Sequence, residues 1–303
     1  MDNQFRPQGF SILPLVVKNL LIINGIFFLA AIAFEYVWQI DLAQYLGLHY
    51  IGASDFRPYQ FVTYMFMHDT SSFAHIFFNM FALWMFGYSI ENAWGPKRFL
   101  IFYFVCGIGA GLTQELVQYL WVNSELQQYI FVVDGIKYIK AEGGVILLSD
   151  FLNIFTTVGA SGAVYGILLA FGMMWPNSRI YIYFAIPIKA KWFVIIYGLI
   201  ELFAGFTSAD NVAHFAHLGG MIFGLGLILY WRYKESGRIP RFNIKFTKNR
   251  NGSSRPKSDW DYNKEQTDMD KKTDEILDKI SKGGYESLTK EEKDFLFRQS
   301  KRY

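Results

Sequence analysis

Long apolar blocks are the feature of this sequence that most limits the folds it can adopt. Of the 303 residues, 52% are hydrophobic and only 18% are charged. Blocks of about 18 or more apolar residues with few charges are typical of membrane-spanning helices. We therefore expect an all-α polytopic membrane protein with six spans. These are roughly Leu15–Tyr36, His75–Ile90, Phe99–Tyr119, a block that starts between Phe151 and Ser161 and ends before Trp175, Trp192–Phe206 and Val212–Trp231.

The order of these blocks predicts three regions. Residues 1–18 form a short cytosolic N-terminus, residues 19–233 a six-span domain, and residues 234–303 a basic linker with a small cytosolic helical module. Inside the six-span domain, two external loops are expected at about 37–74 and 120–150. The second loop alternates Val, Ile and Tyr, which favours a hairpin.

The first block could instead be a cleaved signal peptide, because Ala31-Ile32-Ala33 fits a cleavage site. Its apolar run is longer than the 7–15 residues of a signal-peptide core, so a retained anchor is favoured. The single cysteine, Cys106, permits no disulfide within the chain.

Basic loop residues predict the orientation of the spans. Cytoplasmic loops carry an excess of Lys and Arg, and six spans then leave both termini in the cytoplasm. We also expect a bacterial inner membrane, because no transit-type leader is evident. The basic residues used are Lys97, Arg98, Arg179, Lys189, Lys191 and those of the segment 232–250.

A run of small residues, Gly159-Ala160-Ser161-Gly162, opens the fourth block. Small residues let membrane helices approach closely, so Ser161 alone could be packing filler. His217 in the sixth block supports a chemical role, because a buried serine becomes a nucleophile when an imidazole takes its proton.

Glycines predict that the two helices carrying the serine and the histidine cross closely. Gly162 and Gly166 form one small-xxx-small pair, and Gly220 and Gly224 form another. Such a crossing would bring the hydroxyl within hydrogen-bond distance of the imidazole. Both side chains would then lie in the outer half of the bilayer.

Two histidines compete for the role of base, since His214 lies one turn before His217. Only His217 has glycines at the third and seventh following positions, so His214 is the second choice. Tyr165 lies one turn after Ser161, where its ring could orient the imidazole.

Span two adds two polar residues on one helix face, His75 and Asn79. Together with the Ser161 N–H, such donors could stabilise a developing oxyanion. The alternative is that these residues only hold helices together. Interhelical hydrogen bonds in membranes average about 0.6 kcal/mol, which is a weak reason for several polar groups at one depth. Polar groups that converge inside a membrane point to function.

These motifs resemble those of the rhomboid intramembrane serine proteases, whose signature is His-x-x-x-Asn, Gly-x-Ser-Gly and a histidine followed by Gly-x-x-x-Gly. The chain has them in this order at His75 to Asn79, Gly159 to Gly162 and His217 to Gly224, and the resemblance covers about Asn19 to Tyr233. It implies a rhomboid-like six-helix bundle.

The resemblance also implies roles for individual residues. Ser161 and His217 would form a catalytic dyad without an acidic third member, with Tyr165 stacked on His217 and an oxyanion site at His75 and Asn79. Arg57 and Glu91 match structural positions of the family and are interpreted as loop anchors. His68 stands farther from His75 than we expect, and no role is assigned to it.

The leading hypothesis is therefore an intramembrane serine endopeptidase that cleaves transmembrane protein substrates. The expected partners are such substrates and membrane lipid, with no nucleic acid, cofactor or metal; neither the substrate nor the oligomeric state is indicated. One alternative is a catalytically silent rhomboid-like binder of transmembrane clients. Another is a transporter in which His75, His214 and His217 relay protons or hold a metal.

The C-terminal region is predicted to hold a linker at Asn251–Ser258 and two helices, Thr273–Ser281 and Thr289–Gln299. The second helix begins with a capping-box pattern, Thr-Lys-Glu-Glu. This region is similar to a small C-terminal module found on some rhomboids. We expect a helical hairpin whose apolar face consists of Ile276, Leu277, Ile280, Leu288, Phe295 and Leu296.

Overall fold

The computed structural model describes residues 12–141, 144–182, 186–207, 213–235, 272–284 and 287–300. The chain divides into two compact units, Met1–Gly237 and Arg238–Tyr303. The polar lead, residues 1–8, and the predicted linker, Asn251–Ser258, lie outside the described residues.

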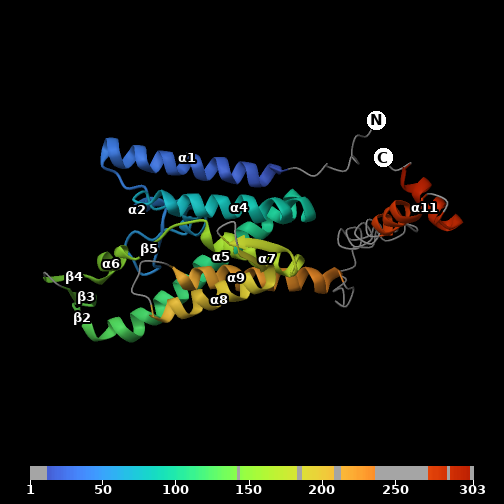
Figure 1. Cartoon of the computed structure of the whole chain (residues 1–303). Helices are drawn as coiled ribbons and strands as arrows, with labels where there is room; N and C mark the ends of the chain where they lie inside the picture. The colour runs from blue at the N-terminus through green and yellow to red at the C-terminus, as the bar shows by residue number, and fades with distance from the viewer. Residues whose placement is uncertain are drawn as a thin grey trace, which may run out of the picture. The chain divides into compact units, whose positions relative to one another are not determined.

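Five helices are long and apolar enough to cross a membrane. The shortest has 18 residues, which at 1.5 Å per residue gives a length of about 27 Å. Figure 1 shows these helices lying alongside one another within the first unit. They are α1 (Leu15–Trp38), α4 (Phe73–Trp94), α5 (Pro96–Trp121), α8 (Ala190–Thr207) and α9 (His214–Glu235).

The fourth expected span is a shorter apolar helix, α7 (Ser161–Met174), of 14 residues. Its length of about 21 Å is below the roughly 30 Å of a bilayer's hydrocarbon core. The described residues therefore hold five full-length candidate spans and one shorter helix, rather than six full-length spans. The sequence α6 (Leu148–Phe151), η4 (Leu152–Ile154) and β5 (Thr156–Thr157) leads into α7.

The connection between α1 and α4 folds into short elements that reach the start of α7. Strand β1 (Leu48–His49) pairs antiparallel with β5, with Leu48 opposite Thr157. This pairing holds the chain extended just before α7. The remaining elements of the connection are α2 (Ala43–Leu46), α3 (Gln60–Thr63) and the 3-10 turn η1 (Tyr64–Phe66).

The segment after α5 contains a three-stranded antiparallel sheet, where the sequence predicted a hairpin. Two short turns, η2 (Val122–Leu126) and η3 (Gln127–Tyr129), lead into it. Figure 1 shows the sheet at one end of the helices of the first unit. Its strands are β2 (Ile130–Val133), β3 (Ile136–Ala141) and β4 (Gly144–Leu147), and a separate hairpin of β6 (Arg179–Ile182) and β7 (Ile186–Lys189) joins α7 to α8.

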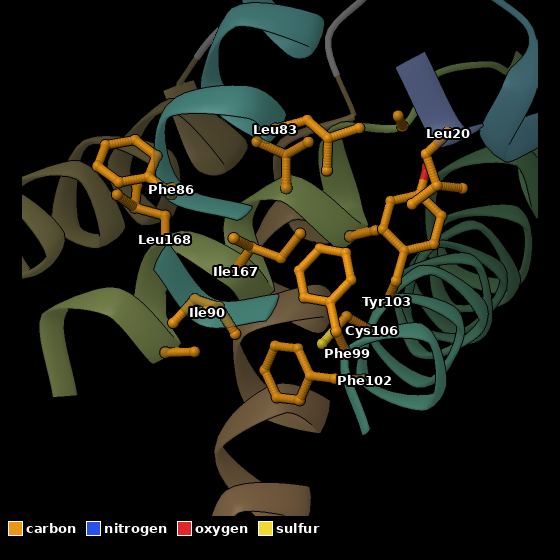
Figure 2. Packing of buried hydrophobic residues seen from close by; sticks show 14 of the residues in the cluster. Leu20, Leu83, Phe86, Ile90, Phe99, Phe102, Tyr103, Cys106, Ile167 and Leu168 are labelled. Atoms are coloured by element: carbon orange, nitrogen blue, oxygen red, sulfur yellow. The ribbon is translucent and has the colours of Figure 1, made fainter. Parts of the chain in front are cut away.

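The core of the first unit lies where α7 packs against α4 and α5. Figure 2 shows Ile167 of α7 among Leu83 and Ile90 of α4 and Phe99 of α5, and all four are fully buried. Dense packing of this kind, rather than exclusion of water, holds membrane helices together. It fixes α7, and with it Ser161, relative to its neighbours.

The second unit contains a helix at 272–283 and α11 (Lys290–Ser300). The predicted capping box is confirmed: the Glu292 N–H donates to Thr289 Oγ1 (3.3 Å), and the Thr289 N–H donates to Glu292 Oε2 (2.8 Å). Ile276 and Leu288 are buried as expected, whereas Leu277 is 51% exposed. The predicted apolar face is therefore wrong at Leu277, and the side chain of Leu296 lies outside the described residues.

Candidate active site

The site begins at the turn that precedes α7. Gly159 has a φ of +126°, a conformation that side-chain-bearing residues rarely adopt. Its N–H donates to the Tyr64 carbonyl (2.9 Å), which anchors the turn to η1. Ser161 is then the first residue of α7, so its N–H belongs to the first turn and lacks an intrahelical acceptor.

Glycines let α7 and α9 cross at van der Waals distance. A Cβ added to Gly220 would lie 1.9 Å from the Gly162 carbonyl oxygen, and one added to Gly224 would lie 3.5 Å from the Gly166 Cα. A third helix joins the crossing, because a Cβ on Gly166 would meet Cys106 Sγ of α5 at 2.4 Å. The close approach predicted from the two glycine pairs is present.

Ser161 and His217 meet across this crossing. The Ser161 Oγ lies 2.8 Å from His217 Nε2, so the predicted contact is present. The Tyr165 ring is stacked on the His217 imidazole with 4.3 Å between centroids and 7° between planes. His217 is buried and Ser161 is half-buried.

His214, the second-choice base, has a different neighbour. Its Nδ1 lies 2.7 Å from Glu201 Oε2. His217, not His214, contacts Ser161 in the structure. His217 lies in the first turn of α9, because the helix begins at His214 and not at the predicted Val212.

A buried acid stands beside His217, contrary to the expectation of no acidic third member. Glu201 of α8 places Oε2 2.9 Å from His217 Nδ1, and its Oε1 accepts a hydrogen bond from the Tyr165 hydroxyl. The side chain is buried. Glu201 belongs to none of the three sequence motifs, although a lone acid in an apolar span is a signal that could identify it.

The oxyanion candidates lie on α4 next to the same turn. His75 Nδ1 accepts the Asp69 N–H (3.3 Å), so a neutral His75 ring carries its proton on Nε2. That Nε2 lies 3.0 Å from the position of a Cβ on Gly159, and Ser161 Oγ lies 3.5 Å from the same point. A donor and the serine hydroxyl therefore stand on the same side of Gly159.

Asn79, one turn further along α4, is buried. Its amide donates one hydrogen bond to the His75 carbonyl (2.9 Å), which commits part of its donor capacity to its own helix. A side-chain amide has a second N–H, so one donor is left for a ligand.

Arg57 and Glu91, interpreted above as loop anchors, both contact backbone groups, Arg57 within its own loop and Glu91 at the start of a helix. The Arg57 guanidinium donates to the Ser54 and Phe56 carbonyls within its own loop. The buried Glu91 carboxylate accepts the N–H groups of Val16 and Val17 (2.9 and 2.7 Å). It therefore caps the start of α1 and ties that helix to α4.

Within the described residues, one group has the composition and spacing of a possible metal site: Glu201, His214 and His217, with ligand atoms within 4.8 Å of one another. Their hydrogen bonds use the carboxylate oxygen and ring nitrogens that a metal ion would need.

Two family models match the chain. The first is described as the Rhomboid domain and matches residues 55–234, more than half of the chain. The second is described as a family of unknown function (DUF6576) and matches residues 258–302, the region that contains the C-terminal helices.

Curated relatives carry rhomboid names. The chain is 28% identical over 215 residues to RHOMBOID-like protein 12, mitochondrial, of Arabidopsis thaliana, covering 68% of this chain and 55% of the relative. It is 26% identical over 198 residues to Rhomboid-like protease 3 of Toxoplasma gondii, covering 65% and 60%. It is 36% identical over 142 residues to RHOMBOID-like protein 2 of Arabidopsis thaliana, covering 45% and 43%. The match thus spans less than two thirds of each of these relatives. Because the Rhomboid model matches more than half of the chain and five of its helices are long enough to cross a membrane, the chain is an integral membrane protein that belongs to the rhomboid family.

Proposed function

We propose that the chain is an intramembrane serine endopeptidase that hydrolyses peptide bonds of transmembrane proteins. The observation that carries the proposal is the 2.8 Å contact between Ser161 Oγ and His217 Nε2. It joins a nucleophile to a base across two helices, with Tyr165 stacked on the base. A name in the family supports the same activity, because one relative is called a protease.

In the proposed reaction, Ser161 Oγ attacks the substrate carbonyl carbon while its proton passes to His217 Nε2. The protonated His217 then gives that proton to the leaving amine, and the C–N bond breaks. Water repeats the cycle on the acyl-serine and releases the carboxylate. Such proton transfer typically accelerates a reaction by about 10²–10⁴-fold.

The negative charge that develops on the substrate carbonyl oxygen during the attack requires hydrogen-bond donors next to Ser161. The His75 Nε2–H lies beside Gly159, the Ser161 N–H opens the first turn of α7, and the second N–H of the Asn79 amide is a further candidate. The N-terminus of α7 also favours negative charge through its helix dipole. One donor of this kind is typically worth about 2.7–4 kcal/mol in the transition state.

The proposed substrates are single-span proteins in lipid. A helical backbone satisfies its own carbonyl groups, so the substrate must unwind locally before Ser161 can reach one. The basic loops support an orientation with both chain termini in the cytoplasm. The names of the relatives do not support the expected bacterial inner membrane, because one of them is mitochondrial.

The test is cleavage of single-span substrates by the purified protein in liposomes, with products read by mass spectrometry. Ser161→Ala should abolish cleavage, whereas Ser124→Ala, an exposed serine beyond α5, should cleave at the wild-type rate. Full activity of Ser161→Ala would overturn the mechanism. Binding of substrates without cleavage by the wild type would favour the silent binder instead.

A further inference from the structure

The carboxylate of Glu201 receives hydrogen bonds from three side chains. Oε2 lies 2.9 Å from His217 Nδ1 and 2.7 Å from His214 Nδ1, and Oε1 accepts from the Tyr165 hydroxyl. These partners come from α7 and α9, whereas Glu201 belongs to α8. Three membrane helices are therefore joined at one buried acid.

An acid at this position needs a reason. Ionisable residues inside membranes are costly and rare, and they mark functional positions by default. The partners of Glu201 are imidazoles and a phenol, which are weaker partners for a carboxylate than a permanent cation. Packing of α8 alone does not require a carboxylate here, because an apolar residue would fill the space without a desolvation penalty.

We propose that Glu201 is a positioning residue for the Ser161–His217 pair and converts it into a Ser–His–Glu arrangement. This inference rests on the proposed peptidase function and goes beyond the dyad that the resemblance implied. The serine, the imidazole and the carboxylate lie in series, with 2.8 Å between Ser161 Oγ and His217 Nε2 and 2.9 Å between His217 Nδ1 and Glu201 Oε2.

The chemistry follows from the hydrogen-bonding capacities of the groups. An ionised carboxylate only accepts, so the proton of a neutral His217 stays on Nδ1 and its Nε2 lone pair faces the Ser161 hydroxyl. When His217 takes the serine proton, the negative charge of Glu201 stabilises the imidazolium. Glu201 keeps its charge throughout, and the Nδ1 proton stays on His217.

Tyr165 supports the same arrangement from two directions. Its ring is stacked on His217, and its hydroxyl donates to Glu201. The plane of the imidazole and the position of the carboxylate are thus held by one side chain. His214 Nδ1 donates to Glu201 Oε2, the same oxygen that accepts the hydrogen bond from His217, and this second bond orients the carboxylate further.

The experiment measures kcat and KM for a single-span substrate in liposomes. Glu201→Gln should lower kcat by about 10²-fold at an unchanged KM, because the neutral amide neither fixes the His217 tautomer nor stabilises the imidazolium. Glu201→Asp, which keeps the charge, should recover part of that loss. The matched control is Glu115→Gln, a buried acid on α5 whose Oε2 accepts the Ile51 N–H and which should keep the wild-type kcat.

A kcat of Glu201→Gln equal to that of the wild type would overturn the positioning role. So would a loss that appears only in KM. The wild type supplies the readout for the peptidase itself: if it cleaves no substrate and Ser161 takes up no fluorophosphonate, the proposed function fails, whereas a reactive wild type with a fully active Glu201→Gln refutes Glu201 alone.

A second measurement needs no Glu201 variant, and it covers the case in which Glu201→Gln does not fold. Nitrogen-15 NMR of histidine-labelled wild-type protein reports which ring nitrogen of His217 carries the proton, with the signal assigned by its loss in His217→Asn. A proton on Nδ1 supports the proposal. A proton on Nε2 of the neutral ring overturns it.

Discussion

Gly162 of α7 and Gly220 of α9 lie so close together that a Cβ added to Gly220 would lie 1.9 Å from the Gly162 carbonyl oxygen. No side chain fits between α7 and α9 at this point, and the contact between Ser161 and His217 depends on that close approach. The glycine pairs are thus part of the site, although they take no part in the chemistry.

Gly220→Ala should separate α7 from α9, because the obstacle is backbone and cannot rotate away. We expect destabilisation above the about 1–3 kcal/mol usual for overpacking, together with loss of substrate cleavage. Thermal unfolding in detergent and a cleavage assay measure the two effects. Gly226→Ala is the matched control on the same helix, because open space surrounds that glycine. This variant should unfold and cleave substrate like the wild type. Equal stability of the two variants would contradict the crossing.

Gly159→Ala should abolish cleavage. Its φ of +126° disfavours any side chain, and the new Cβ would lie 3.0 Å from His75 Nε2, between the proposed oxyanion donor and the nucleophile. The loss should appear in cleavage rate. Gly144→Ala controls for backbone strain alone, because Gly144 has a φ of +141° with open space around it. Activity retained in Gly159→Ala would argue that the turn does not line the substrate position.

His75→Ala should lower kcat by about 10²–10³-fold, the usual effect of removing one oxyanion donor. Its effect should exceed that of Asn79→Ala, because the Asn79 amide already donates one hydrogen to the His75 carbonyl. Steady-state kinetics with one substrate separate kcat from KM. A change confined to KM would assign His75 to substrate binding instead.

His68 predicts a pH dependence of stability. It is 2% exposed in the loop before α4, and burial, followed by the like charge of nearby His75, lowers the pKa of His68 from 6.5 to about 4. The unfolded chain therefore binds more protons between pH 6.5 and 4, so the folded protein loses stability as pH falls through this window and loses no more below it. The loss attributable to His68 is at most about 3.4 kcal/mol.

Unfolding free energies of wild type and His68→Leu between pH 4 and 7.5 measure this effect. The variant should lack the part of the slope that His68 contributes. Parallel slopes in the two proteins would show that His68 does not titrate differently on folding.

The sequence allowed much of the site to be predicted, because its parts lie in short local motifs. The glycine spacings of α7 and α9 predicted the crossing, and the crossing brings Ser161 to His217. Tyr165 followed from helical periodicity, since one turn separates it from Ser161.

Glu201 could not be found in this way. Glu201 and His217 are 16 residues apart and lie on two different helices. Their contact depends on how these helices pack, so no regular spacing in the sequence indicates it. Composition also does not predict where the fourth span starts, because the apolar segment before Ser161 has the composition of a span. The pairing of β5 with β1 and the conformation of Gly159 hold that segment extended, and neither is visible in hydropathy.

The site's central contact is tested most directly by the mass of the protein after treatment with a fluorophosphonate. Wild type should gain one adduct, mapped to the peptide that contains Ser161, and both Ser161→Ala and His217→Asn should remain unmodified. An adduct on another serine, or modification of His217→Asn at the wild-type rate, would contradict activation of Ser161 by His217.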